Sequence, residues 1–195
     1  MTMTPPAPLI LASSSPYRQA LLERLGLPFE AIAPAVNEAA RAQESPEALA
    51  LRLAGDKAAA VAASRPEAVV LGSDQVVALS TEILGKPGTV ERARAQLARY
   101  SGQEVRFVTA VSVRRGEAEV HEVAPVSVRF RHLDAETIAR YIDADRPLDC
   151  AGGIRSEGLG ASLLESVESH DPTALVGLPL IVVARLLRHM GYRLP

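Results

Sequence analysis

The chain has 195 residues, of which 48% are apolar and 23% are charged, and its formal net charge is −2. This composition is typical of an ordinary globular protein with a sizeable core, and we expect a single domain over residues 9–195. The charge excludes a broad electrostatic attraction for a nucleic-acid polymer or an anionic membrane. A small anionic ligand would have to be bound by a few local Arg and Lys residues.

Cysteine content and hydropathy exclude further classes. A single cysteine, Cys150, excludes an internal disulfide and a cysteine-based zinc site. No segment approaches the ~20 consecutive apolar residues of a membrane helix, because Arg185 interrupts the longest candidate. Residues 1–8, MTMTPPAP, are too short and too rich in proline for a signal peptide, and we expect a disordered lead. The cytoplasm is the expected location.

The first structured segment has the pattern of an anion site. Residues 9–12 are predicted to form a buried strand that enters SSSP (13–16), and a helix follows until Gly26. Arg18 then lies in the first turn of that helix, beside free backbone N–H groups. The alternative is that these serines merely cap the helix.

A second strand and helix follow. Residues 29–33 are predicted to be a short strand, and the loop after them carries Glu38, which by itself would be solvated. Ser45 and a proline open a helix to about residue 64. Lys57 lies among alanines on this helix, where it can project into a cleft or simply face solvent.

The central stretch is AVVLGSDQVVALSTEILGKP (68–87). Residues 68–71 are predicted to form a buried strand that Gly72 ends, so that SDQ (73–75) leaves the sheet. A short hairpin then returns the chain to Lys86. Asp74 and Lys86 can therefore face one crevice, which in α/β sheets is where ligands bind. The alternative is a polar turn with both charges solvated.

The remaining elements are predicted in chain order. Thr89 caps a helix, and Asp134 caps another. Between them lie two long strands, and the second strand alternates apolar and polar residues over 126–131, which indicates a half-buried antiparallel strand. Residues 150–160 hold a glycine-rich loop without the spacing of a P-loop or dinucleotide motif. The strands are expected at 105–115, 118–132 and 161–168, and the last helix at 178–190.

Several motifs together resemble the Maf family of nucleoside triphosphate pyrophosphatases. They are LASSSPYR (11–18), VNE (36–38), Lys57, GSDQVV (72–77), GKP (85–87) and the glycine-rich stretch. Within the family, GSDQV, FRHL (130–133), DCAGGIRSEGLGASLLE (149–165) and DPTALVGLPL (171–180) resemble the branch that acts on 7-methyl-GTP. Asn37 departs from the family pattern, which usually has Asp there, so a second carboxylate beside Glu38 is absent.

The resemblance implies an α/β fold, with a long twisted mixed β-sheet, flanking helices and two lobes around a central cleft. It implies hydrolysis between the α- and β-phosphates of 7-methyl-GTP, giving 7-methyl-GMP and pyrophosphate, with Mg²⁺ or Mn²⁺, in a homodimer. The implied catalytic residues are Asp74 (the proton acceptor), Lys57, Lys86 and Arg18. The implied substrate and specificity residues are Ser13, Ser15, Tyr17, Gln75 and Glu157, and the implied metal ligands are Glu38 and Asp74.

Chemical reasoning supports these roles. Arg18 would make forked contacts to phosphate oxygens, Lys57 and Lys86 would act as point charges, and the serine-loop amides would donate N–H groups. Guanine methylated at N7 is a cation, so it would stack on Tyr17, and Glu157 would accept from its donor edge. Core packing of Tyr17 and solvation of Glu157 are the alternatives.

Two other functions stay open. The first is the same reaction on dTTP, UTP or another modified nucleotide. The second is a nucleotide-binding regulator of septum formation that does not depend on turnover. The four histidines show no metal-ligand spacing, and Cys150 is expected to be a small buried residue rather than a nucleophile.

Overall fold

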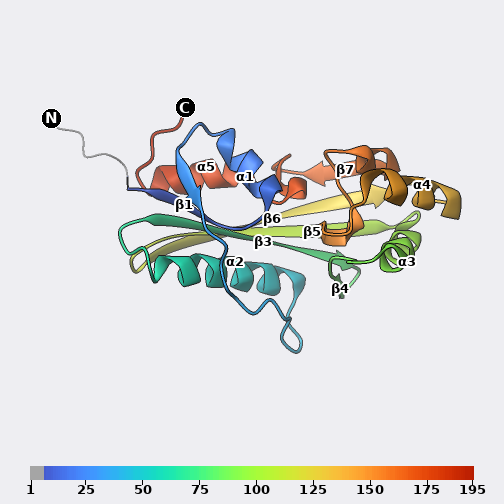
Figure 1. The fold of residues 1–195 in the computed structure, drawn as a ribbon, viewed down its shortest axis with the longest axis horizontal. Coiled ribbons are helices and arrows are strands. Elements are labelled where there is room, and N and C mark those ends of the chain that lie inside the picture. Colours follow the sequence, from blue (N-terminus) through green and yellow to red (C-terminus); the bar gives the residue numbers. More distant parts are fainter. Residues whose placement is uncertain (1–6) are drawn as a thin grey trace.

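A mixed β-sheet forms the centre of the computed structural model, which describes residues 7–195 (Figure 1). In this part of the chain the sheet has seven strands in the order β2-β1-β3-β5-β6-β7, and β4 pairs with β3. The strands are β1 (Leu9–Ala12), β2 (Phe29–Ala31), β3 (Val69–Leu79), β4 (Glu82–Leu84), β5 (Glu104–Arg115), β6 (Ala118–Phe130) and β7 (Leu164–Ser169). β1 runs parallel to β2 and β3, whereas the other pairs are antiparallel.

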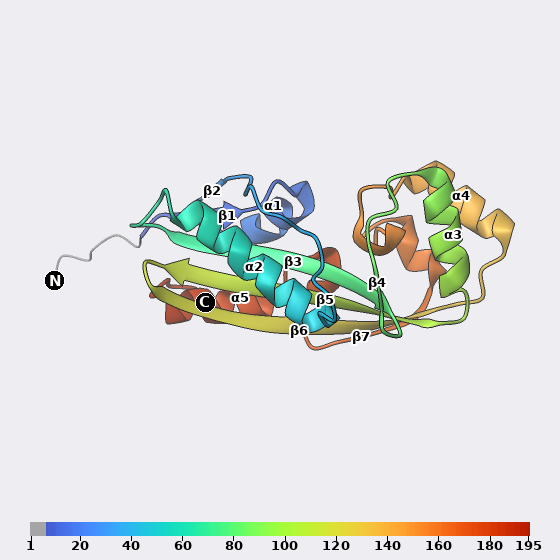
Figure 2. The ribbon, with the colours of Figure 1, turned by 90° about the horizontal axis from the view of Figure 1, so that it is seen from below.

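Helices cover both faces of this sheet. They are α1 (Pro16–Glu23), α2 (Pro46–Ala62), α3 (Val90–Tyr100), α4 (Ala135–Asp145) and α5 (Leu180–His189), with short 3₁₀ turns η1 (Ala151–Gly153), η2 (Leu159–Leu163) and η3 (Ala174–Val176). α2 lies on one face, and α1 and α5 lie on the other (Figure 1). α3 and α4 form a second lobe at the far end of the long strands (Figure 2). The expected α/β fold with two lobes is confirmed.

The predicted helix starts agree with the structure because they rest on local capping chemistry. The side chains of Ser15, Ser45, Thr89 and Asp134 each accept a bond from a backbone N–H in the first turn of their helix. No helix of residues 7–195 is long and apolar enough to cross a membrane.

The predicted break at Gly72 is wrong. β3 continues through the polar residues to Leu79, because β5 pairs with it without interruption from Val70 to Ala78. Asp74 therefore lies inside a strand, opposite Ala110, and not in a turn beyond a strand end. Pairing with a neighbouring strand outweighs the local turn preference of glycine and serine.

The edge of β3 that faces away from β5 is not paired along its whole length. β1 pairs with β3 only as far as the Ala12–Gly72 register, and β4 pairs with it only from Val77 onward. Over residues 7–195, no strand pairs with this edge at residues 73–76. The polar run of β3 thus borders a gap between the end of β1 and the start of β4.

Smaller differences occur near the C-terminus and at the lead. The strand expected at 161–168 is β7 (Leu164–Ser169), because residues 161–163 belong to η2, and the last helix begins at Leu180. The expected lead falls mostly on residues 1–6, which lie outside the described residues. Two residues of the expected lead are described: the Pro8 carbonyl accepts from the Val69 amide at 2.8 Å, and the Ala7 carbonyl accepts from the Tyr192 hydroxyl.

Gly72 allows α2 to approach β3 closely. A Cβ at this position would lie 2.1 Å from the Ala54 carbonyl oxygen and 2.8 Å from the Ala58 amide nitrogen. Since alternate residues of a strand share a face, Gly72 and Asp74 both face α2. The close approach therefore brings Lys57 to Asp74.

We expect Gly72→Ala to lower the free energy of unfolding by about 1–3 kcal/mol, because the added methyl meets backbone atoms that cannot rotate away. Urea denaturation measures this change. Gly85→Ala is the matched control, since a Cβ there meets nothing within 4 Å, and it should change the value by less than about 0.5 kcal/mol. Equal effects of the two substitutions would contradict the close-packing explanation.

Candidate active site

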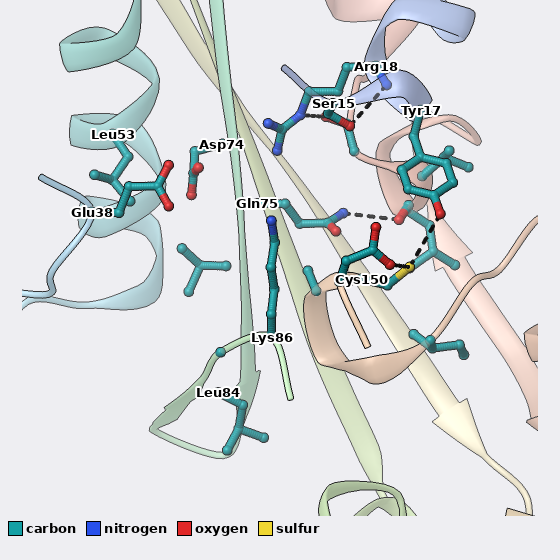
Figure 3. Close-up of a pocket in the computed structure, with 18 of the residues that line it drawn as sticks. Ser15, Tyr17, Arg18, Glu38, Leu53, Asp74, Gln75, Leu84, Lys86 and Cys150 are labelled. Carbon is teal, nitrogen blue, oxygen red and sulfur yellow. Dashed lines mark hydrogen bonds between the residues drawn. The ribbon is translucent and has the colours of Figure 1, made fainter. Parts of the chain in front are cut away.

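A cleft of about 380 Å³ lies at the open edge of β3 (Figure 3). Its volume is within the range of small-ligand sites. A contiguous hollow of about 240 Å³ extends over the serine loop and shares Ser15, Tyr17, Arg18, Glu38, Lys57, Lys86 and Asp149 with the cleft. The predicted residues Gln75, Asp74 and Glu157 line the larger cleft, and Ser13 lines the smaller one. The structure therefore brings all ten predicted residues together.

Lys57 is the centre of a charged cluster. Its ammonium nitrogen lies 2.6 Å from Asp74 Oδ1 and 2.6 Å from Glu38 Oε1. Lys57 and Asp74 are buried, with 6% and 8% of their surface exposed, whereas Glu38 is exposed. The hydrogen bond from Lys57 lowers the pKa of Glu38 below its usual value. Lys57 is thus buried and does not face solvent, whereas Glu38 stays exposed and is ion-paired to Lys57.

The loop that carries Glu38 is fixed to α2 by Arg52. The guanidinium donates to both carboxylate oxygens of Glu44, at 2.6 and 2.9 Å, and to the Ala39 carbonyl at 3.0 Å. Forked arginine–carboxylate pairs of this kind fix geometry well. Because Ala39 follows Glu38 directly, the same contacts hold Glu38 near Lys57.

The donor set of the cluster fits a divalent cation. Lys57 occupies one oxygen of Glu38 and one of Asp74, which leaves each carboxylate a second oxygen. Among residues 7–195, no group of three or more His, Cys, Asp or Glu side chains could hold a metal alone. Mg²⁺ commonly binds through one or two carboxylates and the phosphates of a substrate. These two residues therefore fit a cation that arrives with a phosphate ligand.

Arg18 points into the cleft from the first turn of α1 (Figure 3). Its Nε donates to the Gly177 carbonyl at 2.9 Å, so both terminal nitrogens are left for a ligand. Burial lowers the pKa of the Arg18 guanidinium, and the charges of Asp74 and Glu38 oppose this effect. An arginine remains charged in any case. The arrangement suits a forked contact to phosphate oxygens.

The serine loop differs in detail from the prediction. The Ser13 amide donates to the Leu11 carbonyl at 2.9 Å, and the Ser15 amide donates to Ser13 Oγ at 3.1 Å. These two amides are therefore engaged inside the loop and do not face an anion. The hydroxyl groups of Ser13 and Ser15 remain as donors, since each accepts a bond from a backbone amide, Ser13 Oγ from Ser15 and Ser15 Oγ from Arg18.

Gln75 faces the opposite side of β3 from Asp74. Its Nε2 donates to Thr109 Oγ1 at 2.9 Å and to the carbonyls of Ala174 and Leu175, both at 3.0 Å. Carbonyl oxygens can only accept, so the side-chain nitrogen of Gln75, and not its oxygen, must face the carbonyls of Ala174 and Leu175. The side-chain oxygen is then left as an acceptor for a ligand in the cleft.

Tyr17 lies at the other end of the cleft (Figure 3). Its hydroxyl accepts from the Cys150 thiol at 3.8 Å, and the Arg155 guanidinium lies 5.8 Å from the ring centroid. Burial raises the pKa of Tyr17 and also that of Cys150, which favours a protonated thiol. Tyr17 is half-buried at a pocket wall rather than packed in the core.

The two remaining predicted residues are exposed at the cleft mouth. Lys86 follows β4 and points toward Gln75 (Figure 3), and Glu157 lies in the glycine-rich loop. Gly158 and Gly160 shape that loop, because a Cβ at Gly160 would lie 2.4 Å from the Arg155 carbonyl oxygen. Asp149, to which we gave no role from sequence, also lines both parts of the cleft.

Comparisons with known proteins show the family of this chain. The sequence profile of the Maf-like protein family matches residues 8–190. The chain belongs to the Maf-like protein family. The expected resemblance to this family is thus confirmed, and the mixed α/β fold is consistent with this membership.

Curated Maf relatives cover nearly the whole chain. A protein of Xanthomonas axonopodis pv. citri is 56% identical over 187 residues, which are 96% of this chain and 98% of that protein. Relatives from Aromatoleum aromaticum and Pseudomonas aeruginosa are 53% and 51% identical, each over 96% of this chain and at least 97% of their own length. All three relatives are named 7-methyl-GTP pyrophosphatase.

We expect the Arg52–Glu44 contact to stabilise this Maf chain in a pH-dependent way. Hydrogen bonds from Arg52 lower the pKa of Glu44 from 4.5 to about 2. A carboxylate whose pKa is lowered by folding stabilises the fold above its unfolded pKa, and the contribution is lost as pH falls toward the folded value. The stabilisation should therefore be complete above about pH 5 and decline toward about pH 2.

Urea denaturation of the wild type and Glu44→Gln measures this contribution. The difference in unfolding free energy should be constant between about pH 6 and 5 and should shrink toward about pH 3. A difference that stays constant down to pH 3 would show that the contact does not depend on the Glu44 charge.

Proposed function

We propose that this chain hydrolyses 7-methyl-GTP between the α- and β-phosphates, releasing 7-methyl-GMP and pyrophosphate. The observation that carries the proposal is one cleft with cationic groups and a carboxylate–lysine triad at one end and a tyrosine at the other. The relatives named 7-methyl-GTP pyrophosphatase support the same substrate. The reaction is an acid-anhydride hydrolysis.

The phosphate end of the cleft would hold the triphosphate by charge and hydrogen bonds. Arg18 would place its two terminal nitrogens on phosphate oxygens, because its Nε is already bound to the Gly177 carbonyl. Lys86 lines both hollows and would act as a second cation, and the Ser13 and Ser15 hydroxyls would donate. Such groups stabilise the charge that develops during phosphoryl transfer.

Asp74 would act as the proton acceptor. A water attacks the α-phosphorus, the bond from that phosphorus to the bridging oxygen breaks, pyrophosphate leaves, and the water proton passes to the carboxylate. Lys57 holds Asp74 at 2.6 Å and fixes its orientation. Because Asp74 lies on the rigid strand β3, its position relative to Arg18 is set by the fold.

Glu38 and Asp74 would hold a Mg²⁺ or Mn²⁺ ion together with the phosphates. Such an ion, when bound, neutralises phosphate charge and lowers the pKa of a bound water. The contribution of the chain is to keep the two carboxylates close together, through Lys57 and through the Arg52 anchor of the Glu38 loop.

The base end would recognise a cationic purine. N7-methylguanine carries a delocalised positive charge, which favours stacking on the Tyr17 ring. The Gln75 side-chain oxygen and the Glu157 carboxylate are acceptors, and guanine presents donors at its N1 and N2 positions. Arg155 already lies over the tyrosine ring, so the base would use the opposite face.

A nucleotide panel tests the proposed substrate. We expect pyrophosphate release from 7-methyl-GTP to exceed that from GTP, dTTP and UTP, and to require Mg²⁺ or Mn²⁺. A clear preference for dTTP or UTP would contradict the assignment. We also propose that the chain acts in the cytoplasm as a homodimer without nucleic-acid or membrane partners, and analytical ultracentrifugation tests the dimer.

Asp74→Asn should lower kcat about 10²- to 10⁴-fold, because the amide cannot take the water proton. The same assay with Asp143→Asn, a change of the same chemistry on the exposed surface of α4, should give wild-type rates. Near-full activity of Asp74→Asn would reject the proton-acceptor role. If the variant also kept a cellular division phenotype, the non-catalytic regulator would be favoured.

Tyr17→Leu should reduce the preference for 7-methyl-GTP over GTP by about 2- to 30-fold, the size of one cation–π contact. Tyr17→Phe keeps the ring and is the matched control, so it should keep the preference. The ratio of kcat/KM for the two substrates measures the effect. An unchanged ratio in the leucine variant would place the base elsewhere.

A further inference from the structure

Asp171 is a buried carboxylate that the proposed reaction does not use. It is 3% exposed and accepts four hydrogen bonds. Two come from the Thr173 amide and hydroxyl, at 3.1 and 2.8 Å. The other two come from the amides of Ile181 and Val182 in the first turn of α5, at 2.8 and 3.2 Å. The carboxylate therefore joins two points of the chain that are eight residues apart.

Thr173 completes the connection to α5. The residue before this helix, Pro179, offers no side-chain cap, which would leave the first backbone N–H groups without acceptors. The Leu180 amide donates to Thr173 Oγ1 at 2.7 Å, and Asp171 accepts from the next two amides. We call Asp171 and Thr173 together the clasp. It caps α5 from a distance and closes the loop of residues 174–179.

The closed loop supplies backbone acceptors to the active site. The Gly177 carbonyl accepts from Arg18 Nε at 2.9 Å and from Ser73 Oγ at 3.2 Å. The carbonyls of Ala174 and Leu175 accept from Gln75 Nε2. These bonds decide which atoms of Arg18 and Gln75 are left for a ligand. The position of the loop therefore controls both the phosphate end and the base end of the cleft.

We propose that Asp171 is a positioning residue, which orients Arg18 and Gln75 by holding the 174–179 loop in place. The proposal rests on the pyrophosphatase function proposed above. Asp171 touches no ligand itself and acts only through the loop carbonyls. The Lys57–Asp74–Glu38 cluster lies on the α2 side of β3, and within residues 7–195 its ion pairs are made inside the cluster and not with the loop, so Asp171 leaves the proposed proton acceptor in place.

This role predicts a kinetic signature that differs from simple destabilisation. A variant that merely unfolds in part loses active enzyme, so kcat falls equally for every substrate while KM and substrate preference stay unchanged. A displaced loop instead alters the contacts of the folded enzyme. KM should rise because Arg18 is misplaced, and the preference between 7-methyl-GTP and GTP should fall because Gln75 is misplaced.

The test compares three clasp variants with one control. Asp171→Ala removes all four bonds, Asp171→Asn keeps one acceptor oxygen, and Thr173→Val removes only the hydroxyl contacts. Asp134→Ala is the control, because Asp134 also caps a helix through its carboxylate but contacts only Thr137 in the first turn of α4. Steady-state kinetics with both nucleotides is combined with amide hydrogen exchange over residues 173–182.

Asp171→Ala should lower kcat/KM for 7-methyl-GTP about 10- to 100-fold, as expected for a misplacement on the scale of 1 Å. KM should rise, the preference over GTP should fall at least about threefold, and exchange should increase over 173–182. Asp171→Asn and Thr173→Val should give intermediate values. Asp134→Ala should keep KM and preference at wild-type values.

Two results would overturn the role of Asp171 alone. One is faster exchange in the clasp variants with unchanged KM and preference, and the other is a loss of kcat/KM no different from that of Asp134→Ala. If Asp171→Ala does not fold, Asp171→Asn and Thr173→Val carry the same comparison. A wild type that releases no pyrophosphate from any nucleotide would overturn both the proposed function and this role, so the two failures are distinguishable.

Discussion

The contact between the Lys57 ammonium and the Asp74 carboxylate is the interaction on which the site depends. Taking two charges out of water is costly, and their attraction compensates only when the geometry is close. That geometry requires a helix to lie almost directly on a strand, which Gly72 permits because it has no Cβ to meet the Ala54 carbonyl. The ion pair between Lys57 and Asp74 therefore depends on the close backbone packing of α2 against β3.

The strand pairing explains why the site lies where it does. The pairing of β1 with β3 ends at Gly72, β4 begins to pair only at Val77, and the unpaired edge between them carries the polar residues. The chain segments that lie next to this edge and line the cleft come from both lobes. Arg18 follows β1 in one lobe and Lys86 follows β4 at the other (Figures 1 and 3). The ligand groove is thus a consequence of two strands that stop short.

Local signals in the sequence predicted helix starts well, since a cap is decided within three or four residues, as at Ser45 and Asp134. Through resemblance to a family, the motifs also pointed to ten residues that the fold brings to one cleft. The strand break at Gly72 was wrong because pairing with β5, more than thirty residues later, decides the backbone there. The burial of Lys57 could not be predicted, because it depends on how α2 is oriented on the sheet. The carbonyls that hold Gln75 could not be predicted either, because every residue has a backbone carbonyl and its type does not show which one will accept.

Neighbouring residues of β3 point to opposite sides of the sheet. This places the proposed proton acceptor on one side and a residue proposed to select the nucleotide on the other. Asp74 is built into the layer of α2, whereas Gln75 is built into the layer that contains the 174–179 loop. With the roles proposed above, a substitution beside Gln75 that leaves the Gly177 carbonyl in place can alter which nucleotide is accepted while Arg18 and the Lys57–Asp74 pair keep their positions. A protein with this division can change its nucleotide preference through substitutions in one layer while its proposed proton acceptor is kept in the other.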